Sequence, residues 1–223
     1  MQVRSPRISL VRRLALAGGI AALVFSASRV AVAGAQVEEE LSASVQASLQ
    51  AAISDLAAPR LVFDSEIEAS AWLNEMSARL ATKIPDATTR VDFLKTVHYE
   101  ASRAGLDPQL VLGVIHHESG FKKYAVSPAN ARGYMQVMPF WVRQIGTADQ
   151  NLFNLRINLR YGCTILRHYL AVESGDLFRA LGRYNGSLGR EEYPNAVRAA
   201  MLRYEPSPPG VPVQLGAAIT PAQ

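Results

Sequence analysis

The residue best suited to acid–base chemistry in this chain is Glu118, which lies in the run HHESGF (116–121). It follows Val114 by four residues and Val111 by seven, so it continues the apolar face of a predicted helix. A carboxyl group on such a face is costly to ionise, and its pKa should therefore rise. A raised pKa suits a general acid that works near neutral pH. The alternative interpretation is a glutamate at a fraying helix end that faces water.

Two short clusters later in the chain combine side chains that could hold a sugar. GYMQVMP (133–139) begins with a glycine, whose backbone can approach a ligand closely, and GRYNGS (182–187) ends a predicted helix. Each cluster also has a plain structural interpretation, as a surface turn with a core methionine and as a helix C-terminus. Taken together and in this order, they favour a site that protonates a glycosidic oxygen. The candidate substrate-binding residues are Ser119, Gly133, Tyr134, Met135, Gln136, Tyr184 and Asn185.

Helices must position these residues, because capping signals and helical periodicity recur while long strand-like alternation does not. Asp107 is placed to cap a helix whose first position is Pro108 and whose end lies near Glu118. Ser65 is placed to cap another helix, with Glu68 three residues later. The predicted helical ranges are 38–55, 65–80, 90–104, 107–118 and 176–184. The sequence therefore predicts an all-α fold.

The first 35 residues have the pattern of a secretory signal peptide. They hold five arginines and no acid, and residues 14–27 form an apolar run. Small residues allow cleavage after Ala33 or Ala35. Arg29 interrupts the apolar run before it could span a membrane, which argues against the alternative of an uncleaved anchor. We therefore expect export to the periplasm, with no stable membrane anchor after cleavage.

The net charge of +4 comes mostly from this leader. Five of the 23 basic residues lie there, which leaves 18 basic against 19 acidic residues. An exported chain of that balance is a poor candidate for nucleic-acid binding. The rest divides into an acidic helical extension (36–89), a basic catalytic domain (90–205) and a disordered Pro-rich tail (206–223). The extension could pack against the domain or dock a partner from the cell envelope or a secretion machinery.

Neither a metal site nor a disulfide is indicated. The only cysteine, Cys163, follows helical periodicity and should be buried as a small apolar residue. His116 and His117 are adjacent, so they point about 100° apart on a helix. The HExxH spacing of many zinc sites does not occur. We expect no metal, no other cofactor and a monomeric protein.

The motifs resemble those of the soluble lytic transglycosylases, which are goose-lysozyme-like enzymes that cut bacterial peptidoglycan. The family pattern is Glu-Ser, then Gly-Leu-Met-Gln, then Ala-Tyr-Asn, then a late tyrosine. The matching residues here are Glu118-Ser119, Gly133-Tyr134-Met135-Gln136, Arg183-Tyr184-Asn185 and Tyr193. Tyr134 replaces a leucine of the pattern, and Arg183 replaces an alanine. The resemblance covers about residues 90–205.

The resemblance implies a lysozyme-like catalytic domain that cleaves the MurNAc–GlcNAc β-1,4 bond of peptidoglycan glycan strands without water. Tyr193 would then be a further substrate-binding residue and would hydrogen-bond Glu118. Hydrogen bonds to the sugar would come from Ser119, Gln136 and Asn185. Tyr184 and Met135 would line the cleft.

Glycosidases of the usual kind use two carboxylates, yet no second acid lies close to Glu118 in the sequence. The other candidates, Asp149, Glu173 and Asp176, fit capping or solvated positions better. With one carboxylate, the acetamido oxygen and the 6-hydroxyl of the substrate must complete the reaction, and Glu118 serves as acid and then as base. The alternatives are a hydrolytic muramidase of the same fold and a non-catalytic wall-binding or secretion-associated scaffold.

Overall fold

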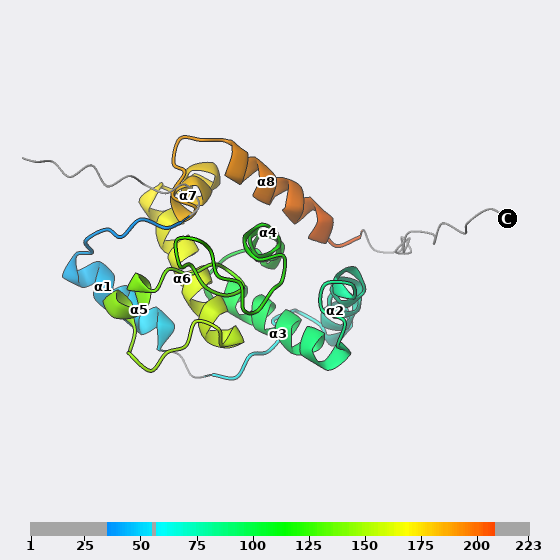
Figure 1. Ribbon diagram of the computed structural model, residues 1–223. Helices are drawn as coiled ribbons and strands as arrows, with labels where there is room; N and C mark the ends of the chain where they lie inside the picture. The colour runs from blue at the N-terminus through cyan, green and yellow to red at the C-terminus, as the bar shows by residue number, and fades with distance from the viewer. Residues whose placement is uncertain (1–34, 55–56, 208–223) are drawn as a thin grey trace, which may run out of the picture. The chain divides into compact units, whose positions relative to one another are not determined.

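The computed structural model describes residues 35–54 and 57–207, and over those residues it confirms the predicted all-α class (Figure 1). The elements are α1 (Ala43–Ile53), α2 (Glu66–Leu80), α3 (Ala87–Arg103), α4 (Pro108–Glu118), α5 (Phe140–Ile145), α6 (Leu155–Val172), α7 (Leu177–Tyr184), α8 (Glu192–Met201) and the short 3-10 helix η1 (Leu202–Tyr204). The leader up to residue 34 and the tail from residue 208 lie outside the described residues, so the predictions made for them stay predictions. Within the described ranges, no helix combines the length and apolar character needed to cross a membrane.

The predicted starts of α2 and α4 are confirmed, and each is capped by the expected side chain, whereas α3 begins at Ala87, three residues before the predicted start. The Ser65 hydroxyl accepts a hydrogen bond from the backbone N–H of Glu68 at 3.2 Å, in front of α2. The Asp107 carboxylate accepts one from Gln109 at 2.8 Å, in front of α4. The first N–H groups of a helix have no partner within the helix, so a side-chain oxygen at this position stabilises the start.

The first helix is shorter than the predicted range of 38–55, which was wrong at its beginning. Ser42 caps α1, and the helix runs only from Ala43 to Ile53. The preceding residues are non-helical, because Gln36 and Glu39 instead contact the body of the protein. Apolar spacing in this segment could not reveal that, since the groups they contact lie about a hundred or more residues further along the chain.

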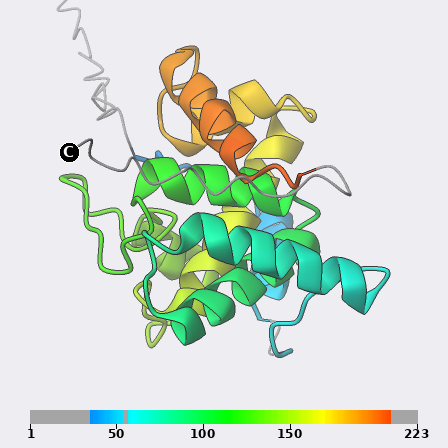
Figure 2. The ribbon, with the colours of Figure 1, turned by 90° about the vertical axis from the view of Figure 1, so that its right-hand side faces the viewer.

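Helix α4 lies between α3 and α8 and carries Glu118 in its last turn (Figures 1 and 2). Its face with Val111 and Val114 is fully buried. On the side toward α8, a Cβ at Gly113 would lie only 2.9 Å from the carbonyl oxygen of Val197. The two helices can approach this closely because residue 113 is a glycine.

The N-terminal extension packs against the rest of the described chain, with α1 on α5 and α6 and α2 on α3. A buried charge cluster joins α1, α3 and α6. Glu100 of α3 is fully buried and is paired with Arg160 of α6 at 2.8 Å and with Arg103 at 3.0 Å. The same two arginines donate to the carbonyls of Ala52 and Ile53 at the end of α1. The C-terminal end of α1 is therefore held by two arginines. The helix dipole favours positive charge at this end.

Candidate active site

Glu118 is half-buried at the end of α4. Its Oε1 accepts a hydrogen bond from the Tyr193 hydroxyl at 2.6 Å. Burial raises the pKa of Glu118 from 4.5 to about 7, and the hydrogen bond from Tyr193 opposes that rise by a smaller amount. The direction of this rise is the one expected for a carboxyl at the end of the apolar face of α4. Below about pH 7 the group is protonated and can donate its proton to a bound oxygen.

Tyr193 reaches Glu118 because α8 crosses close to α4. It lies in the first turn of α8, on the same face as Val197, which touches Gly113. Burial, together with the nearby Glu118 carboxyl, raises the pKa of Tyr193 well above its usual value. The phenol therefore stays neutral and acts as a donor to the carboxyl. The ring of His117 meets the Tyr193 ring edge-on, with centroids 4.9 Å apart.

The turn of residues 133–136 is held against α6 by Asn158. The Asn158 side-chain oxygen accepts from the backbone N–H of Met135, and its amide nitrogen donates to the carbonyls of Arg132 and Leu152, each at 2.8 Å. Gly133 has φ +75°, and a Cβ there would lie 2.4 Å from the Asn158 amide nitrogen. The sequence suggested that a ligand approaches the backbone closely at Gly133. In the structure, the group that lies this close is the Asn158 side chain. Sequence reasoning missed Asn158, whose signal is an asparagine on the apolar face of a helix.

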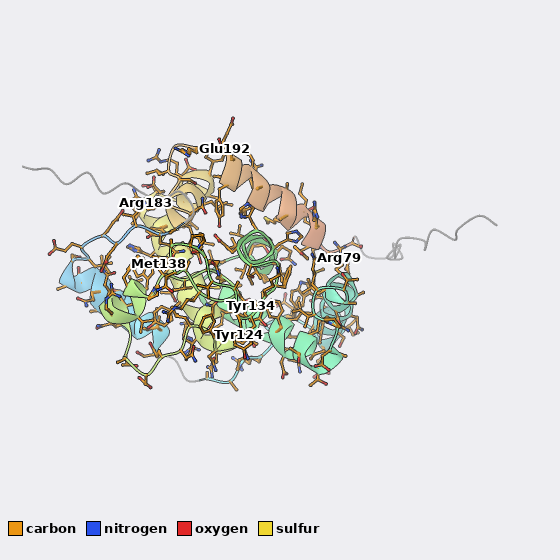
Figure 3. The ribbon with its side chains drawn as sticks, in the orientation of Figure 1. Arg79, Tyr124, Tyr134, Met138, Arg183 and Glu192 are labelled. Carbon is orange, nitrogen blue, oxygen red and sulfur yellow. The ribbon has the colours of Figure 1, made fainter. Side chains whose placement is uncertain are left out.

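Three of the candidate substrate-binding side chains lie in the core beneath the site. Met135 is fully buried against Gly162. Tyr184 is fully buried too, and its hydroxyl donates to the Met135 carbonyl at 2.8 Å. Tyr134, labelled in Figure 3, is buried and packs its ring against Phe93, with centroids 5.0 Å apart. These buried side chains pack under the turn. The part of the turn that remains for a ligand is therefore its backbone.

The polar candidates already make internal hydrogen bonds. The Gln136 amide nitrogen donates to the carbonyls of Ala125 and Gly133, at 3.1 and 2.9 Å. The Ser119 hydroxyl donates to the carbonyl of Ile115 at 3.2 Å. The Asn185 amide nitrogen donates to the Ser187 hydroxyl at 3.0 Å, but the residue is only half-buried. Asn185 is therefore the best placed of these three polar side chains to meet a ligand.

An open cavity of about 500 Å³ adjoins the acid. It is lined by the end of α4, the loop after α7 and the start of α8, through His117, Asn185, Ser187, Arg190, Glu192, Tyr193 and Ala196. Glu118 is not among the lining residues, but its chain neighbour His117 and its hydrogen-bond partner Tyr193 are, so the acid lies next to this cavity. Arg190 and Glu192, at the exposed rim, were not singled out from the sequence. Figure 3 shows Glu192 at the outer end of α8.

The other acids considered from the sequence were expected at capping or solvated positions, and Asp176 is a cap, whereas Glu173 is ion-paired. Asp176 caps α7 by accepting from the N–H of Arg179 at 3.0 Å. Glu173 forms ion pairs with Arg179 and, at 2.6 Å, with Arg183. A hydrogen bond from Thr147 keeps the pKa of Asp149 below its usual value. These contacts give all three carboxylates structural roles.

Comparison with known proteins identifies the domain that carries this site. Residues 95–200, slightly less than half of the chain, match the family of the transglycosylase SLT domain. Residues 95–200 are therefore similar to a transglycosylase SLT domain. All four motifs of the candidate site lie within that range.

Several curated proteins named membrane-bound lytic murein transglycosylase C share part of this sequence. The one from Mannheimia succiniciproducens is 41% identical over 64 residues, which is 29% of this chain and 16% of that protein. The one from Actinobacillus pleuropneumoniae serotype 5b is 51% identical over 47 residues, which is 21% of this chain and 13% of that protein. The matches thus span about one sixth or less of those relatives.

A solved structure, that of an inactive mutant of the lytic transglycosylase Slt from Pseudomonas aeruginosa, aligns with 77% of this chain and 35% of its own. The TM-score is 0.40 and the sequence identity 17%.

Proposed function

We propose that this protein is a peptidoglycan lytic transglycosylase that acts in the periplasm. It cleaves the β-1,4 bond between MurNAc and GlcNAc and leaves a 1,6-anhydro-MurNAc end. The observation that carries the proposal is the Glu118 carboxyl, whose pKa is raised to about 7 beside an open cavity in a transglycosylase SLT domain.

In the first step, Glu118 gives its proton to the glycosidic oxygen, and the bond from that oxygen to C1 of MurNAc breaks. The GlcNAc fragment leaves as an alcohol. The acetamido oxygen on C2 of the MurNAc shields the positive charge that develops at C1. This takes the place of the second carboxylate that most glycosidases use.

In the second step, the Glu118 carboxylate takes the proton of the MurNAc 6-hydroxyl, and the oxygen of that hydroxyl bonds to C1. The acid is restored and no water is consumed. One group thus works first as an acid and then as a base, for which a pKa near neutrality is the best compromise. The neutral Tyr193 hydroxyl holds the carboxyl in place during both steps and stabilises its charged form.

A hydrolytic muramidase is the second candidate, and Glu192 is the observation that favours it. Among the described residues that line the cavity beside Tyr193, Glu192 is the one acidic side chain. It is exposed and could serve as the base that activates a water. In that case the products would carry reducing ends.

Mass spectra of the muropeptides released from purified sacculi separate these functions. We expect products one water lighter than their reducing-end counterparts, absent with Glu118→Gln and unchanged with Glu192→Gln. Reducing-end products that disappear with Glu192→Gln would establish the muramidase instead. Binding to sacculi with no products from wild-type protein would leave the non-catalytic scaffold.

A further inference from the structure

Residues 35–40, here called the N-terminal strap, cross two of the motifs that form the candidate site. The Gln36 side chain is buried, with 4% of its surface exposed. Its amide nitrogen donates to the backbone carbonyl of Gln136 at 3.1 Å, and its amide oxygen accepts from the backbone N–H of Met138 at 2.9 Å. One end of the strap is thus fixed to the turn that carries the second motif.

The strap also touches the third motif, which lies at the end of α7. Gly186, next to Asn185, has φ +68°, and a Cβ there would lie 2.0 Å from the carbonyl oxygen of Ala35. The backbones at 35 and 186 can come this close because residue 186 is a glycine. Figure 1 shows the segment before α1 running beside α7, in agreement with this contact.

Two ion pairs hold the exposed part of the strap. Glu39 meets Arg183 of α7 at 2.8 Å, and Glu38 lies 3.5 Å from Arg143 of α5. Arg183 and Met138 are labelled in Figure 3, and both belong to the surface that the strap crosses. Arg183 stands where the family pattern has alanine, which could not make this ion pair. The departure from the pattern is therefore accounted for by the strap.

The contacts of Gln36 are those that an acetamido group would make. A primary carboxamide and an N-acetyl group each present one carbonyl acceptor and at least one N–H donor on the same carbon. The carbonyl of Gln136 and the N–H of Met138 form a matching acceptor and donor pair. Beneath the strap, a cavity of about 280 Å³ remains between Val37, Glu39, Arg183 and Gly186, so the strap is not packed solidly on the domain.

We infer that the N-terminal strap occupies part of the glycan-binding cleft, with Gln36 in the place of a substrate amide. The strap must be displaced before a glycan strand can bind along the whole cleft. Gln36 therefore competes with the glycan for its site, and Glu39 with Arg183 sets how firmly the strap is held. The inference rests on the proposed function, because it takes a glycan as the ligand of the cleft.

The test measures binding of a GlcNAc tetrasaccharide by calorimetry, in protein purified after export and carrying Glu118→Gln to prevent turnover. Gln36→Ala should lower the Kd about fivefold, since the competing side-chain hydrogen bonds are lost. Glu39→Gln should lower it by a smaller factor. Glu40→Gln, an exposed residue of the same strap, is the matched control and should leave the Kd unchanged.

A Kd that is unchanged or raised in Gln36→Ala would overturn the inference. It would also be overturned if the exported protein, once purified, no longer contained Gln36. Hydrogen exchange at the Met138 amide provides a readout that needs no ligand. Exchange there should become faster in Gln36→Ala and not in Glu40→Gln, and equal protection in both would also overturn the inference. If no variant binds the tetrasaccharide and the protein with Glu118 intact releases no muropeptides from sacculi, the proposed function fails as well, so the two failures are distinguishable.

Discussion

At the scale of single residues, the site depends on how one carboxyl is removed from water. Glu118 ends the buried face of α4, and Tyr193 of α8 supplies a hydrogen bond to its Oε1 at 2.6 Å. Desolvation favours the neutral acid, whereas the hydrogen bond favours the carboxylate, and the first effect is the larger. As a result, Glu118 is protonated up to near neutral pH and can still donate its proton.

The stability of the protein should therefore depend on pH through Glu118. Its folded-state pKa of about 7 exceeds the ordinary value of 4.5, so the folded protein holds the extra proton between these values. Relative to acidic solution, the free energy of unfolding should fall as pH rises from 4.5 to about 7 and then level off. Glu118→Gln should be more stable than wild type by about 1–3 kcal/mol at pH 8 and nearly equal to it at pH 5. Urea unfolding at both values checks this, and an equal difference at the two would contradict it.

Replacing Tyr193 by phenylalanine should separate orientation from acidity. In the wild-type protein the Tyr193 hydrogen bond stabilises the carboxylate. Without it, the pKa of Glu118 should rise further, and the alkaline limb of the pH–rate profile should move to higher pH. Turnover should fall about tenfold or more, because the carboxyl is no longer held in place. Tyr204→Phe is the control, since that hydroxyl contacts His116 instead, on the same helix. If the rates of Tyr193→Phe fall equally at every pH and the alkaline limb does not shift, Tyr193 does not set the pKa of Glu118.

At the scale of helices, close packing decides where the functional groups meet. Gly113 lets α8 approach α4, and Asn158 fixes the 133–136 turn on α6. The helix caps and the apolar face leading to Glu118 were predictable, because each depends on residues a few positions apart. The contact of Asn158 with Met135 spans 23 positions and that of Gln36 with Gln136 spans 100. Periodicity and caps carry no information about such pairings, so the strap could not be predicted.

The buried cluster around Glu100 is the clearest stability determinant among the described helices. Glu100→Gln would leave arginines of α3 and α6 without their buried carboxylate. Removing one partner of a buried ion pair typically costs about 3–5 kcal/mol, and we expect a loss of that order. Thermal unfolding followed by circular dichroism would measure it. Glu66→Gln, on the exposed first turn of α2, should change stability by less than about 1 kcal/mol. Equal effects of the two substitutions would refute the role assigned to the cluster.

At the scale of the whole molecule, the boundary expected at residue 89 does not separate two structures. Helix α3 begins at Ala87 and runs across it, and α1 packs on α5 and α6. The two segments carry opposite net charge, but only a few of the acids of the extension take part in the packing, such as Glu38 and Glu39. Backbone carbonyls at the end of α1 also accept hydrogen bonds from Arg103 and Arg160, and net charge cannot reveal such contacts.

The buried thiol of Cys163 provides a built-in gauge of unfolding. It is the only cysteine of the chain, it lies on α6 with no exposed surface, and burial raises its pKa. A thiol reagent can react with it only when the protein around α6 opens, and the signal then comes from one known atom. The labelling rate thus reports the opening equilibrium of the unaltered protein. The effect of each substitution described above can be read from that single sulfur without adding a probe.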